Sequence, residues 1–220
     1  MNGAPTEPEV VDEVHGVAAD IGSMEIRGAA TIADAAARAL GVQAAESEAD
    51  EPSTFRAQLR AAARVLYDTR PTAVSLPNAL RYVFRDVEGT TVEELRTSVR
   101  ASVAEFRDRL DTAQNDLGRV GANRLRDGDT VLTHCHSTDA LSCVEHAVEQ
   151  GKDISAIVKE TRPRNQGHIT AAQLRDLEVD VTLIVDSAAR RYLDDADHVV
   201  VGADSIAADG GVVNKIGTSG

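Results

Sequence analysis

Residues 130–160, "TVLTHCHSTDALSCVEHAVEQGKDISAIVKE", begin and end with short apolar runs rich in β-branched residues. Between these runs apolar side chains recur at helical spacing, so the stretch is typical of a strand, a helix and a second strand. Two further runs of the same kind lie at 181–186 and 198–204, and each follows another helical pattern. Buried strands that alternate with helices predict an α/β fold with a Rossmann-like, doubly wound parallel sheet.

The first half of the chain, by contrast, predicts helices. The stretch "GAATIADAAARALG" at 28–41 is rich in alanine, and Gly41 is expected to end this helix. The strongest helical pattern lies at 91–121, where apolar residues from Val92 to Val120 recur at spacings of three and four. Such spacing predicts one continuous apolar stripe along a long helix.

These patterns divide the chain into an N-terminal helical domain at residues 1–125 and an α/β domain at 126–220. A chain of 220 residues is long enough for both parts to bury a core. Only four strand-like runs are present, fewer than a complete doubly wound domain usually carries. We therefore expect the α/β domain to be incomplete at its C-terminal end.

The formal net charge is −13, and twenty arginines outnumber the three lysines, Lys152, Lys159 and Lys215. An acidic surface with little lysine is typical of adaptation to very high salt, because concentrated salt screens the repulsion between carboxylates. The composition therefore predicts a halophilic source. The same acidity argues against nucleic acid as a partner.

Composition also bears on location. No apolar stretch approaches the roughly 18 residues of a membrane span. The N-terminal segment "MNGAPTEPEVVDE" lacks the basic start and apolar core of a signal peptide. Two cysteines, Cys135 and Cys143, do not make a disulfide framework. We therefore expect a cytoplasmic protein that does not associate with a membrane.

Polar residues follow each of the four strand-like runs. Ligands of open α/β sheets bind beyond the carboxyl ends of the strands, which meet at one edge of the sheet. We therefore expect one site at this edge. The residues that would converge there are Cys135, Glu160, Arg162, Arg164, Gln166, Asp186, Asp204, Asn214 and Lys215.

Cys135, in the stretch "HCHS", has three possible roles. Zinc binding is disfavoured, because no second cluster of cysteine or histidine ligands follows this stretch, so no metal site is predicted. A buried core cysteine is a strong alternative, since cysteine is among the most buried residue types. A reactive thiolate is favoured by the helix that starts after the strand, because helix N-termini lower thiol pKa values. Cys143 lacks such a context and is interpreted as a core residue.

Three stretches with arginine predict anion binding. Arg27 and Gly28 stand at a helix start, where backbone N–H groups and a guanidinium suit a phosphate. Arg70 precedes a turn fixed by prolines, and Arg162 precedes Pro163, which would hold guanidinium groups for bidentate recognition. The structural alternatives are an ordinary helix start, a turn and a surface loop of ion pairs.

Five stretches, in their order and spacing, resemble one known family. It unites ribose-1,5-bisphosphate isomerases, methylthioribose-1-phosphate isomerases and the alpha, beta and delta regulatory subunits of translation initiation factor 2B. The stretches at 70–83 and 160–171 resemble the archaeal ribose-1,5-bisphosphate isomerases most. The five stretches are "SMEIRGAATIADAAARAL" (23–40), "TRPTAVSLPNALR" (69–81), "VLTHCHSTDAL" (131–141), "ETRPRNQGHITAAQL" (160–174) and "VVVGADSIAADGGVVNKIGTSG" (199–220).

The resemblance implies roles for individual residues. Cys135 and Asp204 match the catalytic pair of the isomerases. Relatives often have asparagine where this chain has His136, and the family's C-terminal segment after "NKIGT" is expected to be missing. The residues that match the family's phosphate and sugar contacts are Arg27, Gly28, Arg70, the Arg162 loop with Gln166, Asn214 and Lys215.

The resemblance therefore implies an isomerase that converts ribose 1,5-bisphosphate to ribulose 1,5-bisphosphate, in nucleotide (AMP) and pentose bisphosphate metabolism. Because a phosphate on C1 blocks ordinary ring opening, an acid must protonate the ring oxygen while a base removes the C2 proton. Our hypothesis makes Asp204 the acid, kept protonated by burial, and the Cys135 thiolate the base. Such chemistry requires no metal and no organic cofactor.

Other functions fit parts of the sequence. A methylthioribose-1-phosphate isomerase would use the same pair, but its substrate would need an apolar pocket in place of a second cluster of cations. A non-catalytic regulatory subunit would bind a partner subunit without turnover. Dinucleotide binding is disfavoured, because the loop after the first strand lacks Gly-x-Gly-x-x-Gly. The resemblance further implies a homo-oligomer, a dimer or a trimer of dimers.

Overall fold

The computed structural model describes residues 8–219, and the chain divides into two compact units. The first unit is Met1–Leu110 and the second is Asp111–Gly220, so the division lies within α5 (Val92–Ala122). The sequence placed the boundary at residue 125, after this helix. An unbroken helical pattern gives no sign that the two ends of one helix pack into different units.

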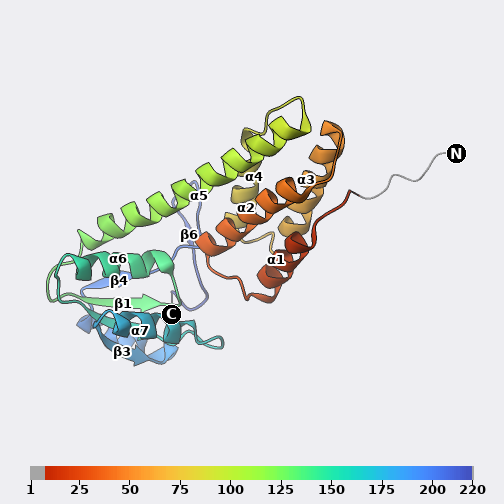
Figure 1. The fold of residues 1–220 in the computed structure, drawn as a ribbon. Helices are drawn as coiled ribbons and strands as arrows, with labels where there is room; N and C mark the ends of the chain where they lie inside the picture. The colour runs from red at the N-terminus through yellow and green to blue at the C-terminus, as the bar shows by residue number, and fades with distance from the viewer. Residues whose placement is uncertain (1–7, 220) are drawn as a thin grey trace. The chain divides into compact units, whose positions relative to one another are not determined.

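The first unit is a bundle of helices around an aliphatic core (Figure 1). The alanine-rich α2 contacts α1, α3 and α4, because its small side chains let neighbouring helices approach closely. Phe55 is the largest side chain that this core buries completely. The helices are α1 (Asp12–Ser23), α2 (Ala29–Glu46), α3 (Pro52–Tyr67), α4 (Ser75–Arg85) and the first turns of α5.

Helix α2 does not end at Gly41, so that prediction is wrong. The absence of a side chain at Gly41 serves packing instead: an added Cβ would lie 3.6 Å from a methyl group of Val103. The helix ends five residues later, at Glu46, where Arg96 donates hydrogen bonds to carbonyl oxygens at the end of the helix. The guanidinium donates to the carbonyl oxygens of Ala44 at 2.9 Å and Ser47 at 3.0 Å. A cation at a helix C-terminus satisfies carbonyls that have no partner within the helix.

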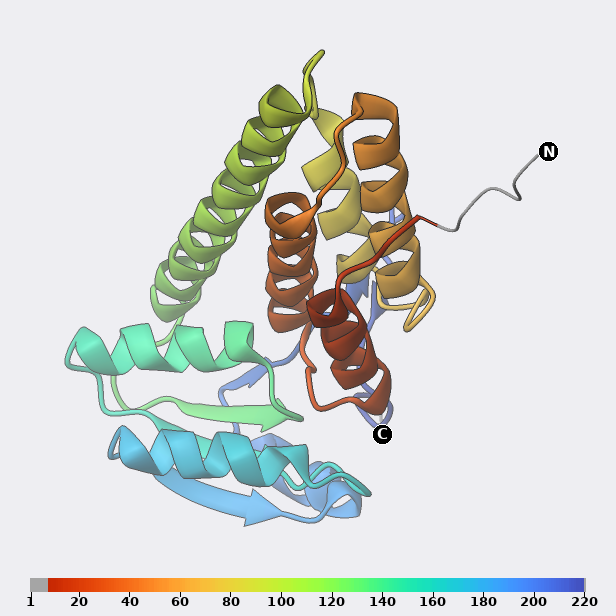
Figure 2. The same ribbon diagram turned by 45° about the vertical axis from the view of Figure 1, so that its right-hand side comes forward.

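The second unit contains a parallel sheet with the strand order β3-β2-β1-β4, and Figure 2 shows strands of this sheet beside its helices. On one face, Leu141 of α6 and Leu174 of α7 pack with Val131 of the sheet, and on the other face Tyr192 packs against Leu132. Helices on both faces of a parallel sheet confirm the predicted Rossmann-like fold. The elements are β1 (Thr130–His134), α6 (Thr138–Glu149), β2 (Ser155–Lys159), α7 (Gln166–Asp176), β3 (Asp180–Ile184), α8 (Ala189–Tyr192) and β4 (His198–Val200).

A small antiparallel hairpin follows β4 and was not predicted. Its strands β5 (Ser205–Ile206) and β6 (Val212–Val213) are two residues long, too short to show an alternating pattern. The one available signal was the Asp209–Gly210 pair, a typical turn sequence. The hairpin closes through the amide of Ala207, which donates to the carbonyl of Gly211 at 2.8 Å.

The long helix predicted at 91–121 is α5, and its apolar stripe is buried only over part of its length. Leu95 and Val99 are completely buried in the core of the first unit. Leu117 and Val120, near the other end, are 45% and 58% exposed.

The contact between α5 and α6 is made by glycines instead. An added Cβ on Gly118 would overlap the hydroxyl of Ser142, and one on Gly121 would overlap the sulfur of Cys143. Because glycine has no apolar side chain, a search for hydrophobic periodicity does not find this helix contact.

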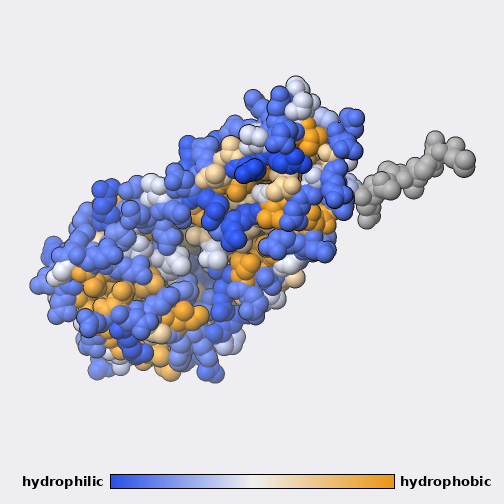
Figure 3. All heavy atoms as spheres, in the orientation of Figure 1, coloured by the Kyte–Doolittle hydropathy of each residue, from blue (hydrophilic) through white to orange (hydrophobic). Residues whose placement is uncertain are grey.

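Hydrophilic residues cover most of the face drawn in Figure 3, as expected for a chain with 27% charged residues. Apolar residues reach the same face in patches between them. Within residues 8–219, no helix is both long enough and apolar enough to cross a lipid bilayer.

Candidate functional site

Cys135 follows the last residue of β1 and has a left-handed backbone conformation, with φ at 71°. This conformation is uncommon for cysteine, and such residues cluster at functional sites. Two threonines hold it in place. The Cys135 amide donates to Thr161 Oγ1 at 2.8 Å, and Thr170 Oγ1 donates to the Cys135 carbonyl at 2.9 Å. The backbone of Cys135 is therefore fixed by the loop after β2 and by α7.

The Cys135 side chain is 8% exposed, and its sulfur lies 3.5 Å from Oε1 of Gln166. Gln166 is the first residue of α7 and is itself buried. This contact brings together two residues that the sequence assigned to one site. Cys135 is buried among polar groups and belongs to none of the apolar clusters of the described residues, so the core-cysteine alternative accounts for its burial but not for its neighbours.

The loop after β2 is held by Asp186, which follows β3. The two carboxylate oxygens accept the amide N–H groups of Thr161 at 2.9 Å and Arg162 at 2.8 Å. Thr161 is another non-glycine residue with a positive φ, 61°. The side chains of Arg162 and Arg164 are exposed, so both guanidinium groups can reach an anion from solution. The carboxyl ends of β2 and β3 are thereby joined, as the sequence predicted.

His134, the last residue of β1, is 2% exposed and bridges two segments. Its Nε2 lies 3.0 Å from the carbonyl oxygen of Ile216, and its Nδ1 lies 3.3 Å from Thr161 Oγ1. Because a carbonyl only accepts, Nε2 carries the proton. Burial lowers the pKa of His134, and the nearby Lys159 and Lys215 act in the same direction. The ring is therefore neutral at neutral pH, and Nδ1 carries no proton.

We expect the free energy of unfolding to fall as the pH drops below about 6.5, the ordinary pKa of an unfolded histidine. Because the pKa of His134 is lowered in the folded chain, the unfolded chain binds the additional proton first, and acid favours unfolding. Denaturant titrations on both sides of this pH measure the slope. His134→Gln keeps a neutral N–H donor and should reduce the slope, and an unchanged slope would contradict this assignment.

The loop after β4 also reaches the end of β1. Ser137 Oγ, at the N-terminus of α6, donates to the carbonyl of Gly202 at 3.2 Å. Gly202 has a φ of 58°, and an added Cβ would overlap the side-chain amide of Asn214. Three segments that are distant in the sequence, the Cys135 loop, the loop before Asp204 and the segment of Asn214, therefore meet at one edge of the sheet.

Asp204 is exposed among residues 8–219, so the hypothesis that its carboxyl is buried, and kept protonated by that burial, is wrong. The residue stands at the base of the surface hairpin, where its amide donates to the carbonyl of Val213 at 3.0 Å. The apolar pattern of the preceding strand suggested a buried end, but the strand stops at Val200 and the chain then runs along the surface.

Arg27, Gly28 and Arg70 belong to the first unit. Gly28 precedes α2 with a φ of 93°, and an added Cβ would meet only Thr31 Oγ1 at 3.5 Å, so the space above it is open. The first turn of α2 contains no acidic residue and has no side-chain cap. Arg27 and Arg70 are half-buried and form no ion pair with any of residues 8–219. In an acidic chain, guanidinium groups without carboxylate partners favour binding of an external anion.

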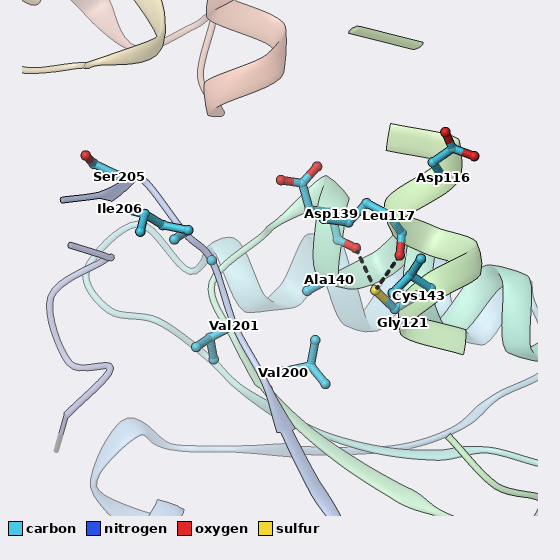
Figure 4. Close-up of a pocket in the computed structure, with 13 residues that line it drawn as sticks. Asp116, Leu117, Gly121, Asp139, Ala140, Cys143, Val200, Val201, Ser205 and Ile206 are labelled. Carbon is cyan, nitrogen blue, oxygen red and sulfur yellow. Dashed lines mark hydrogen bonds between the residues drawn. The ribbon is translucent and has the colours of Figure 1, made fainter. Parts of the chain in front are cut away.

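A pocket of about 620 Å³ lies in the second unit, between α5, α6 and the loop after β4 (Figure 4). Its wall is mostly apolar, with Leu117, Val200 and Ile206. Cys143 lines it and contacts the carbonyl oxygen of Asp139, 3.2 Å away (Figure 4). Burial raises the pKa of the Cys143 thiol, and the nearby Asp139 carboxylate adds to this effect. Cys143 is therefore a poor nucleophile, and its interpretation as a core residue stays a prediction, because it also belongs to none of the apolar clusters of the described residues.

The supports of the site were not predicted from the sequence. Thr161 and Thr170 hold Cys135, and Lys159 is buried at the end of β2. The burial of Lys159 could have been expected from the neighbouring residues, because the strand SAIVK is apolar on both faces before the lysine. Nothing in the spacing of the threonines pointed to their role. Within residues 8–219, no three His, Cys, Asp or Glu side chains come together in a way that could hold a metal ion.

Comparison with known proteins places the chain among isomerases and initiation-factor subunits. A relative from Haloferax volcanii named ribose 1,5-bisphosphate isomerase is 71% identical, and the match covers 97% of this chain and 66% of the relative. One of the same name from Haloterrigena turkmenica is 68% identical, covering 97% and 65%. The chain thus spans about two thirds of the length of these curated relatives. Both sources fit the halophilic adaptation predicted from the acidic, lysine-poor composition.

More distant relatives show the breadth of the resemblance. A methylthioribose-1-phosphate isomerase from Thermosipho melanesiensis is 39% identical, covering 92% of this chain and 62% of that protein. The crystal structure of the Pyrococcus horikoshii translation initiation factor eIF-2B superposes with a TM-score of 0.85 at 27% identity, covering 95% of this chain and 72% of that one. The model of the Initiation factor 2 subunit family matches residues 25–220. The chain therefore belongs to the Initiation factor 2 subunit family.

Proposed function

We propose that this chain carries the active site of an isomerase that converts ribose 1,5-bisphosphate to ribulose 1,5-bisphosphate. The observation that carries the proposal is the conformation of Cys135, which is left-handed and held by Thr161, Thr170 and Gln166. A cysteine that only fills a core needs neither the conformation nor the polar supports. The relatives that bear this name at 71% and 68% identity support the choice of substrate.

The proposed reaction moves two protons and needs no net oxidation. An acid protonates the ring oxygen as its bond to C1 breaks, and a base removes the proton from C2, which leaves an enol phosphate across C1 and C2. A proton then adds to C1 while the C2 hydroxyl loses its own, giving the 2-ketone. We assign the Cys135 thiolate as the base and Asp204 as its partner in proton transfer. The carboxyl of Asp204 is exposed at the base of the hairpin.

The remaining residues are proposed to bind the two phosphates. Arg27 and Gly28, at the uncapped start of α2, offer a guanidinium and backbone N–H groups. Arg70 adds a second guanidinium without a carboxylate partner among the described residues. In the second unit, the corresponding groups are those of Arg162, Asn214 and Lys215.

We expect Asp204→Asn to reduce turnover about 100-fold, at the lower end of the usual effect of a general acid or base. The amide keeps the size and polarity of the carboxyl but cannot transfer a proton. Phosphorus NMR follows ribose 1,5-bisphosphate and ribulose 1,5-bisphosphate directly, because the phosphate on C1 changes its environment. Turnover equal to that of the parent protein would remove Asp204 from the mechanism.

The same assay separates the alternative functions. A methylthioribose-1-phosphate isomerase would convert that substrate in preference to the bisphosphate. A regulatory subunit would convert neither and would instead form a stable complex with another subunit. The identity of 39% with a methylthioribose-1-phosphate isomerase, against 71% and 68% for the other group, favours the bisphosphate. The homo-oligomer and the cytoplasmic location stay predictions from the sequence.

A further inference from the structure

Lys159, the last residue of β2, is a buried lysine that the proposed chemistry does not use. It is 3% exposed, and within residues 8–219 no carboxylate forms an ion pair with it. Its ammonium donates to the carbonyl oxygen of Gly217 at 2.7 Å. Lysine is rarely buried unless it is paired, because taking an ammonium out of water is unfavourable. An aliphatic side chain would fill this position at a lower desolvation cost, so the hydrogen bond to Gly217 calls for an explanation.

The neighbouring strand ends in a second buried donor. His134 and Lys159 pair in register across β1 and β2, and their side chains lie on the same face of the sheet. His134 Nε2–H donates to the carbonyl of Ile216 at 3.0 Å, and Lys159 donates to the next carbonyl along the chain. Two adjacent strands thus bind two successive peptide carbonyls of one segment.

Apolar burial does not explain why this segment stays at the sheet, since the side chain of Ile216 is 87% exposed. Within the segment, Thr218 closes a turn by donating to the carbonyl of Lys215 from its amide at 3.2 Å and from its hydroxyl at 2.6 Å. Asn214 Nδ2 also donates to Thr218 Oγ1 at 3.2 Å. These bonds shape the turn, whereas the bonds from His134 and Lys159 attach it to the sheet.

We propose that Lys159 is a positioning residue that, together with His134, fixes Asn214 and Lys215 for binding a phosphate of the substrate. The inference rests on the proposed function for the identity of that substrate. The ammonium of Lys159 is committed to Gly217 and buried, so it acts through the segment and does not touch the ligand itself. Attachment at Ile216 and Gly217 leaves the two preceding side chains at the edge of the sheet where the Cys135 loop lies.

The test compares Lys159→Met, which keeps the length and loses the donor, with Lys152→Met. Lys152 is a matched control, because its ammonium also donates to backbone carbonyls of the second unit, those of Ala122 and Leu125, at 2.7 and 2.9 Å. It precedes β2 and therefore lies at the opposite edge of the sheet from the proposed site. Both variants lose hydrogen bonds from a lysine, but only one loses them at the turn.

Two readouts do not require turnover. Hydrogen exchange followed by mass spectrometry should show faster exchange at residues 214–219 in Lys159→Met, about tenfold or more for loss of a charged hydrogen bond, and no change there in Lys152→Met. Inorganic phosphate, titrated by calorimetry, should bind about tenfold more weakly to Lys159→Met than to Lys152→Met. Unchanged exchange and affinity in Lys159→Met, or equal losses in both variants, would overturn the proposal.

A third readout uses the reaction. Lys159→Met should raise the KM for ribose 1,5-bisphosphate about tenfold with a smaller change in kcat, since binding is lost rather than proton transfer. If the parent protein converts no bisphosphate, the proposed function fails, while exchange and phosphate binding still decide the role of Lys159. If Lys159→Met does not fold, Lys159→Gln replaces it and must show faster exchange at the same residues.

Discussion

Replacement of Cys135 by serine is expected to reduce the conversion of ribose 1,5-bisphosphate by about 1,000- to 10,000-fold, the upper part of the range for loss of a general base. Serine is nearly the same size and keeps the backbone contacts of Cys135 to Thr161 and Thr170. Its hydroxyl does not ionise near neutral pH, so it cannot remove the C2 proton. Phosphorus NMR measures the turnover, and circular dichroism confirms that the variant is folded.

Cys143→Ser is the matched control for this variant. Cys143 is also a buried cysteine of the second unit, but it contacts α5 and the carbonyl of Asp139. Its replacement should leave turnover within about twofold of the parent protein, as expected for a residue outside the proton-transfer machinery. If Cys135→Ser retained full turnover, or if both variants lost activity equally, the catalytic role of Cys135 would be contradicted.

Gly167→Ala is expected to have the largest effect on stability, about 3 kcal/mol of lost unfolding free energy, the upper end of the usual range for overpacking. An added Cβ would overlap the carbonyl oxygen of Lys159 and lie 2.8 Å from its carbonyl carbon. Both atoms belong to the backbone of β2 and cannot move aside like a side chain. Helix α7 would have to shift away from the strand, and with it Gln166 and Thr170, which contact Cys135. Urea denaturation measures the loss.

Gly16→Ala is the control, since Gly16 is also a glycine within a helix, α1, and nothing lies within 4 Å of an added Cβ. There the greater helix propensity of alanine acts alone and should stabilise the chain by about 0.5 to 1 kcal/mol. Equal effects of the two substitutions would mean that the approach of α7 to β2 is less close than the structure shows.

Apolar periodicity predicts the helices and strands of this chain better than it predicts which of them are in contact, and the glycines show why. The strand and helix patterns of residues 130–200 predicted the parallel sheet, because burial on both faces makes strands apolar throughout. Gly41 was interpreted as a helix end from local rules alone. Its actual role is to lie against Val103, a residue on another helix of the first unit. Because glycine has no side chain, the sequence does not indicate which residue packs against it.

The part of the site that lies at the carboxyl ends of the strands could be predicted from the sequence. Cys135, Gln166 and Asn214 were expected at one edge because parallel strands bring their carboxyl ends together. The supports of Cys135 were not predictable, since Thr161 and Thr170 act through hydroxyl contacts of 2.8 and 2.9 Å that depend on how the loop after β2 and α7 pack against the end of β1.

Apolar periodicity and motif order in the amino-acid chain were enough to establish the fold class, the edge of the sheet that carries the polar groups and the family. These features depend on interactions that repeat along the chain, so each is visible within a short stretch. The backbone conformation of Cys135, the exposure of Asp204 and the burial of Lys159 became apparent only in three dimensions. Each depends on contacts, or on missing contacts, between residues far apart in the chain, and no local pattern encodes those distances.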